Sequence, residues 1–237
     1  MTFSNITGSF FGGQLLSPSS PAITYAGGGT SNTSASWGTP SGAGQSGYTF
    51  TTPSTISATA LPPVSSTALI SLGTFQHINF PISSGTSITA MKLLFSADVD
   101  IDGLSIGSRS FLYQFSHDET PNSAEPCAYG GANNQGVNID GCADRVNVNF
   151  ISQSDSFMID GVAYTLDVTG FVTNGTDHVT NFLTREGAVN SAEIVGRLAL
   201  FTEAAAVPEP ASWALMIGGF GMIGAVARRR RDSLATA

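Results

Sequence analysis

Residues 157–168 read FMIDGVAYTLDV, and this stretch indicates the fold class. The Asp160-Gly161 pair lies between two runs of strand-forming residues. This dipeptide favours the type I′ turn of a two-residue β-hairpin, in which both central residues need positive φ. Asn174-Gly175 gives a second signal of the same kind. The sequence therefore predicts antiparallel strands joined by tight turns.

Alternation of apolar and polar residues extends this pattern outward. Val146 and Val148 alternate with Asn147 and Asn149, a period of two that is typical of a half-buried strand. Residues 2–207 show no convincing amphipathic helix. The expected strands are short, are separated by Gly and Pro, and show no βαβ pattern. These features predict a mostly β body, an antiparallel β-sandwich or jelly roll. Further strands are expected at residues 45–52, 67–75, 86–102, 109–116, 162–169 and 193–201.

Residues 17–68 are rich in Ser, Thr, Gly, Ala and Pro, a composition that also suits a flexible linker. Tyr25, Trp37, Tyr48 and Phe50 are spaced through the segment. Disordered segments lack such apolar anchors, so we expect irregular strands and loops of the same domain.

Length and charge limit the function classes. The 237 residues fit one ordinary domain with appendages. Four of the nine Lys and Arg residues lie at 228–231, which leaves five in residues 1–207; fifteen of the seventeen Asp and Glu residues lie there, because only Glu209 and Asp232 follow. Such a body repels nucleic acid, and we expect no nucleic-acid partner.

The segment 211–227, ASWALMIGGFGMIGAVA, carries no charge. As a helix it would be about 25 Å long, slightly short of the roughly 30 Å hydrocarbon core of a bilayer. Trp213 lies near one end, and Arg228, Arg229, Arg230 and Arg231 follow the other, where they would stay cytoplasmic. A helix buried in a protein core is the alternative, which the adjoining arginines argue against. We expect a single C-terminal membrane helix, with the body outside the cytoplasm.

Pro208-Glu209-Pro210 precedes this segment, and its two prolines favour an extended, accessible peptide. Together with Trp213-Ala214, the Gly-rich apolar span and the arginine cluster, it resembles the PEP-CTERM sorting signal of Gram-negative bacteria. The resemblance implies recognition at residues 208–210 by an exosortase, a membrane enzyme that cuts such tails. It divides the chain into an exported domain (1–207), a sorting signal (208–231) and a short cytoplasmic tail (232–237). The protein would lie in the inner membrane before processing, and then in the cell envelope or outside the cell.

Residues 1–16, MTFSNITGSFFGGQLL, have no basic region and no apolar run typical of a signal peptide. Because an exported body needs a leader, we expect the true start to lie upstream, or a leader to have been lost.

Cys127 and Cys142 lie in a region rich in Gly and Asn. In an exported protein an even cysteine count indicates a disulfide, and closing a loop of about 15 residues would contribute roughly 3 kcal/mol. Two thiols with no histidine at finger spacing make a poor zinc site.

The body also resembles the choice-of-anchor K domain, a family of surface-associated domains attached to different sorting tails. The resemblance spans most of residues 6–202 and implies a β-rich exported domain with no established chemistry and no catalytic residues to carry over. The matching residues are Trp37-Gly38, residues 75–82 (FQHINFPI), Thr120-Pro121-Asn122, the cysteine pair with Asp144-Arg145-Val146, and Tyr164-Thr165-Leu166 leading to Gly170-Phe171.

Residues 103–107, GLSIG, match the G-x-S-x-G nucleophile elbow around Ser105. His117 or His178 could supply a base, and Asp140 or Asp144 could orient it. The elbow requires a following helix, whereas SRSFLYQF reads as a strand, so we expect no enzyme.

Asp98, Asp100 and Asp102 alternate with apolar residues and precede Gly103, like the start of a calcium loop. The twelfth position is Arg109, where an EF-hand needs a glutamate, so the simpler interpretation is a strand that ends in a turn. Three like charges on one face would repel, which keeps open a β-type calcium site formed by these three aspartates.

The His117-Asp118-Glu119 run is interpreted as polar loop residues, because consecutive side chains on a strand point to opposite faces. His77 is interpreted as a packed or hydrogen-bonded histidine, since no partner lies at ligand spacing.

The sequence thus predicts a non-catalytic exported protein with a structural or adhesive role in the cell envelope or extracellular polysaccharide. Abundant Ser, Thr, Asn and aromatic residues suit contact with hydrated sugars, because rings stack on sugar faces while hydroxyls and amides form hydrogen bonds. The alternative is a calcium-dependent carbohydrate-binding module. We expect an exosortase as a partner, the membrane through the C-terminal helix before processing, and no cofactor; exopolysaccharide as a further partner and calcium as a ligand stay open.

Overall fold

The structure, a computed structural model, describes residues 1–58, 69–150 and 154–201. These residues form strands and one short 3-10 turn, η1 (Gly136–Asn138). The strands are β1 (Thr2–Leu15), β2 (Thr24–Ala26), β3 (Asn32–Trp37), β4 (Ser46–Thr51), β5 (Thr55–Ser57), β6 (Ile70–Asn79), β7 (Ile88–Ile101), β8 (Leu104–Asp118), β9 (Asp144–Phe150), β10 (Phe157–Ile159), β11 (Val162–Thr173), β12 (Asp177–Val179), β13 (Asn181–Thr184) and β14 (Ala188–Leu200).

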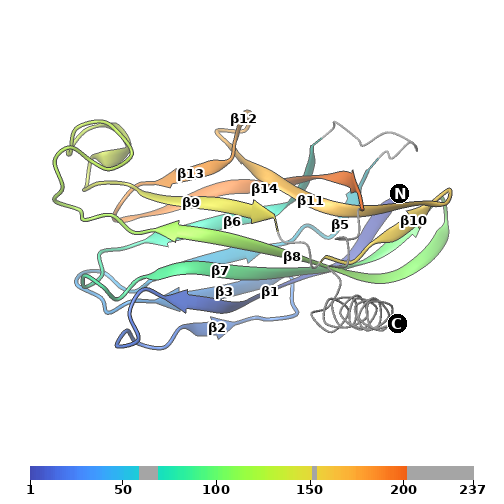
Figure 1. Cartoon of the computed structure of the whole chain (residues 1–237), viewed down its shortest axis with the longest axis horizontal. Helices are drawn as coiled ribbons and strands as arrows, with labels where there is room; N and C mark the ends of the chain where they lie inside the picture. Colours follow the sequence, from blue (N-terminus) through green and yellow to red (C-terminus); the bar gives the residue numbers. More distant parts are fainter. Residues whose placement is uncertain (59–68, 151–153, 202–237) are drawn as a thin grey trace, which may run out of the picture. The chain divides into compact units, whose positions relative to one another are not determined.

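The strands assemble into two sheets, which can be followed in Figure 1. One sheet has the order β13-β9-β8-β7-β1-β5. The other has the order β10-β11-β14-β6-β4-β3-β2, with β12 paired to β11. All strand pairs within the described residues are antiparallel. The prediction of a mostly β, antiparallel body is confirmed.

Aromatic side chains from both sheets form one shared core. From Met91 to Val99 every second residue of β7 is buried, which places one face of the strand inward. Contacts cross between the sheets: the ring centroids of Phe75 and Phe115 lie 5.2 Å apart, and those of Phe50 and Phe95 6.5 Å apart. Each fully buried phenylalanine contributes about 1.5–3 kcal/mol to folding.

The sheets curl toward each other at one edge, where the backbones are themselves hydrogen-bonded. The amide of Gly8 on β1 donates to the carbonyl of Thr30 at 2.9 Å, and the amide of Gly29 donates to the carbonyl of Gly8 at 2.9 Å. This bridge joins β1 of one sheet to the loop between β2 and β3 of the other.

Both predicted turns are present. Asp160 and Gly161 have φ of 47° and 80°, as a type I′ turn between β10 and β11 requires. Asn174 and Gly175, with φ of 51° and 77°, connect β11 to β12. The turns were predictable because positive φ is a local demand that few residue types meet.

The predicted strands are present over the described residues, and several are longer than expected. β8 begins at Leu104 and ends at Asp118, whereas residues 109–116 were predicted. Residues 17–58 contribute β2 to β5, as expected. Trp37, Tyr48 and Phe50 anchor that segment in the core. Tyr25 is 42% exposed and contributes a hydrogen bond instead, since its hydroxyl accepts from the amide of Gly13 on β1 at 2.9 Å.

No helix within residues 1–58, 69–150 and 154–201 is long and apolar enough to cross a membrane. The predicted helix at 211–227, the Pro208-Glu209-Pro210 motif, Trp213 and the arginine cluster lie outside the described residues.

Candidate functional site

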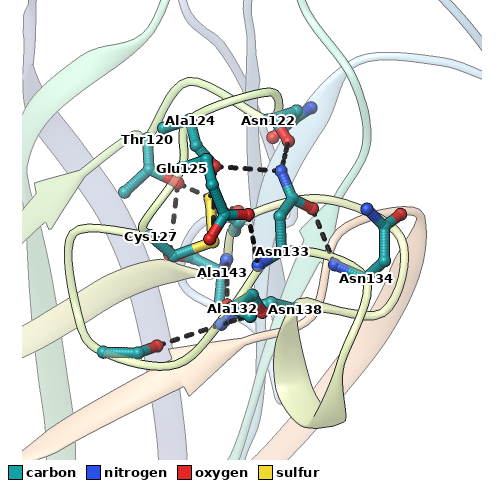
Figure 2. Close-up of a disulfide and its surroundings, with 12 residues drawn as sticks. Thr120, Asn122, Ala124, Glu125, Cys127, Ala132, Asn133, Asn134, Asn138 and Ala143 are labelled. Carbon is teal, nitrogen blue, oxygen red and sulfur yellow. Dashed lines mark hydrogen bonds between the residues drawn. A yellow bond between two sulfur atoms is a disulfide. The ribbon is translucent and has the colours of Figure 1, made fainter.

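A disulfide-linked loop connects β8 to β9 (Figure 2). The predicted bridge between Cys127 and Cys142 is confirmed, with the two Cα atoms 5.2 Å apart. Asparagine side chains brace the loop from within. The Nδ2 of Asn133 donates to the carbonyl oxygens of Asn122 at 2.8 Å and Ala124 at 3.1 Å, because amides can satisfy backbone groups that no sheet pairs.

The loop returns to the sheet beside Thr120, which fixes the first residue of β9. The amide of Thr120 donates to Oδ1 of Asp144 at 2.7 Å. Its hydroxyl donates to the carbonyl of Cys142 at 2.9 Å. The disulfide loop therefore holds one oxygen of the Asp144 carboxylate in place.

Three carboxyl groups meet at this end of the sandwich: Glu119 follows β8, Asp144 begins β9, and Glu186 lies between β13 and β14. Each offers an oxygen within 4.8 Å of the oxygens of the other two. Asp144 is 0% exposed and Glu186 1% exposed. We name these three residues the acidic cluster.

Burial controls the protonation of the acidic cluster. It raises the pKa of Asp144 well above its usual range, and the negative charge of Glu119 raises that pKa further. Burial, followed by the charge of Glu119, raises the pKa of Glu186 to about 7. Without a positive charge beside it, Asp144 therefore favours its neutral form, and Glu186 is partly protonated at neutral pH.

His117 adjoins the cluster, and its interpretation as a loop residue was wrong, because β8 continues through Asp118 and buries the imidazole. Its Nε2 lies 3.4 Å from Oε2 of Glu119, and its Nδ1 lies 2.7 Å from the hydroxyl of Tyr48. A carboxylate only accepts, so a neutral His117 carries its proton on Nε2 and accepts from Tyr48 at Nδ1. Asp118 points to the other face, as expected, and pairs with Arg145 at 2.8 Å.

His77 on β6 is wholly buried, as predicted. Its Nδ1 lies 2.8 Å from the hydroxyl of Thr184, which in turn donates to the carbonyl of Asp144 at 3.4 Å. When Thr184 donates to that carbonyl, Nδ1 of His77 carries the proton and Nε2 is left as an acceptor, to which none of the described residues donates. His77, His117 and Asp144 also present ligand atoms within 4.8 Å of one another. Burial lowers the pKa of His77 well below its usual range, so the imidazole is neutral.

A pocket of about 340 Å³ opens beside the acidic cluster. Glu119 and Asn122 line it, and the hydroxyl of Ser87 donates to Oε2 of Glu119 at 3.0 Å. Glu119 therefore belongs both to the buried cluster and to a surface depression.

A second pocket, of about 450 Å³, lies over β13 and the turn after β11. Neutral amide and hydroxyl side chains alternate there with apolar ones. Its lining residues are Val137, Thr173, Asn174, Val179, Asn181, Phe182, Leu183, Asn190 and Ser191.

Asp98, Asp100 and Asp102 lie on β7 and in the turn that joins it to β8. Oδ2 of Asp98 accepts a hydrogen bond from Asn5 at 2.7 Å, and Oδ1 of Asp100 accepts one from the amide of Gly103 at 2.8 Å. Asp102 has φ of 52° in the turn. These aspartates are at the opposite end of β8 from Glu119, and they are not among the groups of described residues whose ligand atoms converge within 4.8 Å.

Ser105 is the second residue of β8, and the chain continues as a strand. The sequence-based prediction of a strand after GLSIG is confirmed, and the strand-turn-helix arrangement of a nucleophile elbow does not form at Ser105. His178, an exposed residue of β12, comes from the other sheet.

From the sequence, Asp144 was given a chemical role only as an orienting residue, apart from its place in the resemblance to the choice-of-anchor K domain, and Glu186 was not named. Glu186 carried no local signal, because its neighbours in the cluster come from β8 and β9, far away in the sequence.

Comparison with known proteins supports the interpretation of the tail. Residues 206–231 match the family model described as the PEP-CTERM protein-sorting motif. The comparison with curated proteins found no match. The chain therefore carries a PEP-CTERM sorting signal, which implies an exported protein with an exosortase as its processing partner.

Proposed function

We propose that residues 1–207 form a non-catalytic structural or adhesive domain, delivered by its tail to the cell envelope or the extracellular polysaccharide. The match of residues 206–231 to the sorting motif carries this proposal. In the precursor, the helix at 211–227 holds the protein in the inner membrane until the exosortase cuts near Pro208-Glu209-Pro210. The resemblance of the body to the choice-of-anchor K domain supports the same role. Two points stay predictions from the sequence: the jelly-roll connectivity of the body, and the division of the chain into segments 1–207, 208–231 and 232–237.

The second pocket supports contact with polysaccharide. Its side chains offer amides and hydroxyls for hydrogen bonds with sugar hydroxyls, beside apolar surface for sugar faces. Most aromatic residues are in the core instead, and among the described ones Phe11 and Tyr25 are the large exposed rings. Polysaccharide contact would therefore depend on amides more than on stacked rings.

The processing role of the tail can be tested with Pro208→Ala/Pro210→Ala in the full chain. We expect uncleaved precursor to accumulate in the inner membrane, because the extended recognition peptide is lost. Size on denaturing gels and membrane fractionation measure this. Pro18→Ala/Pro21→Ala, at exposed positions of the body, is the matched control and should be processed normally. Normal release of the tail variant would refute the recognition role.

The adhesive role can be tested through Asn181, an exposed residue of the second pocket. We expect Asn181→Ala to reduce the fraction of processed protein that sediments with the extracellular polysaccharide. Asn32→Ala removes an exposed amide on β3, which does not line this pocket, and is the control. Equal retention of both variants would count against the pocket.

The alternative, a calcium-dependent carbohydrate-binding module that uses Asp98, Asp100 and Asp102, makes a different prediction. There, a chelator should release the protein from polysaccharide, and Asp98→Asn/Asp100→Asn should do so without a chelator. We also propose that the body is not an enzyme. Ser105→Ala should therefore leave the processing of the precursor and its retention in the polysaccharide unchanged.

A further inference from the structure

We propose that Glu119, Asp144 and Glu186 bind a calcium ion at the end of the sandwich, beside the disulfide loop. This site is separate from the three aspartates of the β7–β8 hairpin and goes beyond the structural or adhesive role.

The geometry of Asp144 supports a ligand role. The amide of Thr120 donates to Oδ1 at 2.7 Å and holds it in place, and the hydroxyl of Thr120 lies 3.2 Å from the same oxygen. Oδ2 is buried, and no described residue donates a hydrogen bond to it. One oxygen is thus positioned by the protein while the other keeps its lone pairs for a ligand.

Glu186 shows the same lack of partners more strongly. Both carboxylate oxygens are buried, and neither receives a well-aligned hydrogen bond from the described residues. The side chain of Asn122 and the amide of Gly187 lie close enough to lower the pKa of Glu186, but less than burial raises it. Oδ1 of Asn122, which lines the adjoining pocket, is also buried without a donor among them. Buried polar atoms are nearly always paired, so several unpaired oxygens at one place indicate a group that the protein chain does not supply.

Charge points to a cation. The arginines of the adjoining segments are engaged elsewhere: Arg145 pairs with Asp118, and Arg185 pairs with Asp140. The neighbouring charges that act on Asp144 are those of Glu119 and Glu186, which are both acidic. A divalent cation would neutralise carboxylates that otherwise repel one another.

The donor atoms select calcium over a transition metal. Three carboxylates and a nearby amide oxygen are hard oxygen ligands, as calcium prefers. Both nitrogens of His117 are occupied by Tyr48 and Glu119, so that imidazole orients a ligand and is not itself one.

His77 supplies an independent observation. Its Nε2 is buried and has no partner among the described residues, and a ring nitrogen of His77 lies within 4.8 Å of a carboxylate oxygen of Asp144. Calcium keeps water molecules among its ligands, and such a water could donate to this nitrogen.

The pocket gives the ion an entry path. Its lining includes Glu119 and Asn122 together with hydroxyl side chains of Ser83, Ser84 and Ser87. These groups can replace water ligands one at a time as the ion moves inward.

The test is a calcium titration of the chelator-treated full-length protein, followed by calorimetry and by thermal unfolding. We expect saturable binding of one calcium ion and a rise in Tm that grows with calcium concentration. Glu186→Gln, which keeps the size of the side chain, should weaken binding at least tenfold. Glu193→Gln, the same change at an exposed position of β14, should bind as the parent does.

Two further variants cover a folding failure of Glu186→Gln and calcium binding at the β7–β8 hairpin. If Glu186→Gln fails to fold, as judged by circular dichroism without calcium, Glu119→Gln at the pocket takes its place. Asp98→Asn/Asp100→Asn should leave the calcium response unchanged. The proposal is overturned if calcium produces neither binding heat nor a rise in Tm in the parent, or if folded Glu186→Gln or Glu119→Gln binds calcium as the parent does. It is also overturned if only Asp98→Asn/Asp100→Asn loses calcium binding, or if the protein binds zinc more tightly than calcium.

Discussion

Asp118 and Asp144 show how position within a strand decides what a carboxylate does. Asp118 is at the end of β8 on the outer face, where a partly exposed pair with Arg145 contributes at most about 1 kcal/mol. Asp144 begins β9 on the inner side, where burial raises its pKa and leaves one oxygen without a donor among the described residues. The residue type is the same, and the face of the sheet makes the difference.

Asp167 on β11 gives a prediction about pH. Burial raises its pKa, although Arg197 on the neighbouring strand β14 lowers it in part. A raised folded-state pKa means that the contribution of Asp167 to stability is fully present below its unfolded pKa, about 3.9, and is lost as pH rises through the folded pKa. Asp167→Asn should remove that loss, so its stability relative to the parent increases from pH 4 to pH 7.

Urea unfolding at a series of pH values measures this effect. Asp177→Asn, at an exposed position, serves as the control. Parallel pH profiles for Asp167→Asn and the parent would contradict the prediction.

Gly73 gives a second prediction at this scale. It lies at an irregularity in the pairing of β6 with β14 and has φ of 149°. A Cβ there would lie 2.5 Å from the carbonyl oxygen of Thr51 and 2.9 Å from the ring of Phe50. We expect Gly73→Ala to lower the free energy of unfolding by about 2–4 kcal/mol. Gly28→Ala, whose Cβ would meet nothing closer than 3.5 Å, should have a much smaller effect by urea unfolding.

Among the structural elements, the β8–β9 loop shows how irregular backbone can still be rigid. No ladder pairs its backbone between Thr120 and Ala143, so asparagine amides and the disulfide satisfy and constrain it. Because the loop also positions Thr120 against Asp144, its order affects the acidic cluster directly.

Removal of the disulfide should therefore destabilise the body. We expect Cys127→Ser/Cys142→Ser to lose about 3 kcal/mol, because the unfolded chain regains the entropy of a loop of about 15 residues. Urea unfolding with and without reductant measures this. Reductant should lower the stability of the parent to that of the variant and leave the variant unchanged, since the chain has only these two cysteines. Equal stability of oxidised parent and variant would show that the bridge adds nothing.

At the scale of the whole molecule, residues 1–201 form one compact unit. All described strands and the shared aromatic core belong to this unit. A chain that ends at Phe201 should therefore fold and unfold in one cooperative transition, with a Tm close to that of the full-length protein. Loss of cooperativity, or a fall in Tm of more than about 5 °C, would mean that the tail contributes to the fold.

Local chemistry allowed the sequence to determine the turns, the disulfide and the sorting signal. Asp160-Gly161 and Asn174-Gly175 are visible because positive φ restricts the choice of residue at a single position. The tail is visible because its motif, apolar span and charges follow one another directly. Strand alternation likewise depends on neighbours two residues apart, which is why a mostly β body was predictable.

Only the tertiary structure decided which side chains meet. His77 contacts Thr184 across 107 positions of sequence, and Asp144 reaches Glu119 and Glu186 only after β8, β9 and β13 have aligned in register. Register is set by the packing of whole sheet faces, and a shift by one residue would turn each of these groups to the opposite face. The acidic cluster therefore forms only through long-range strand pairing, whereas the sorting signal can be recognised from residues 206–231 alone.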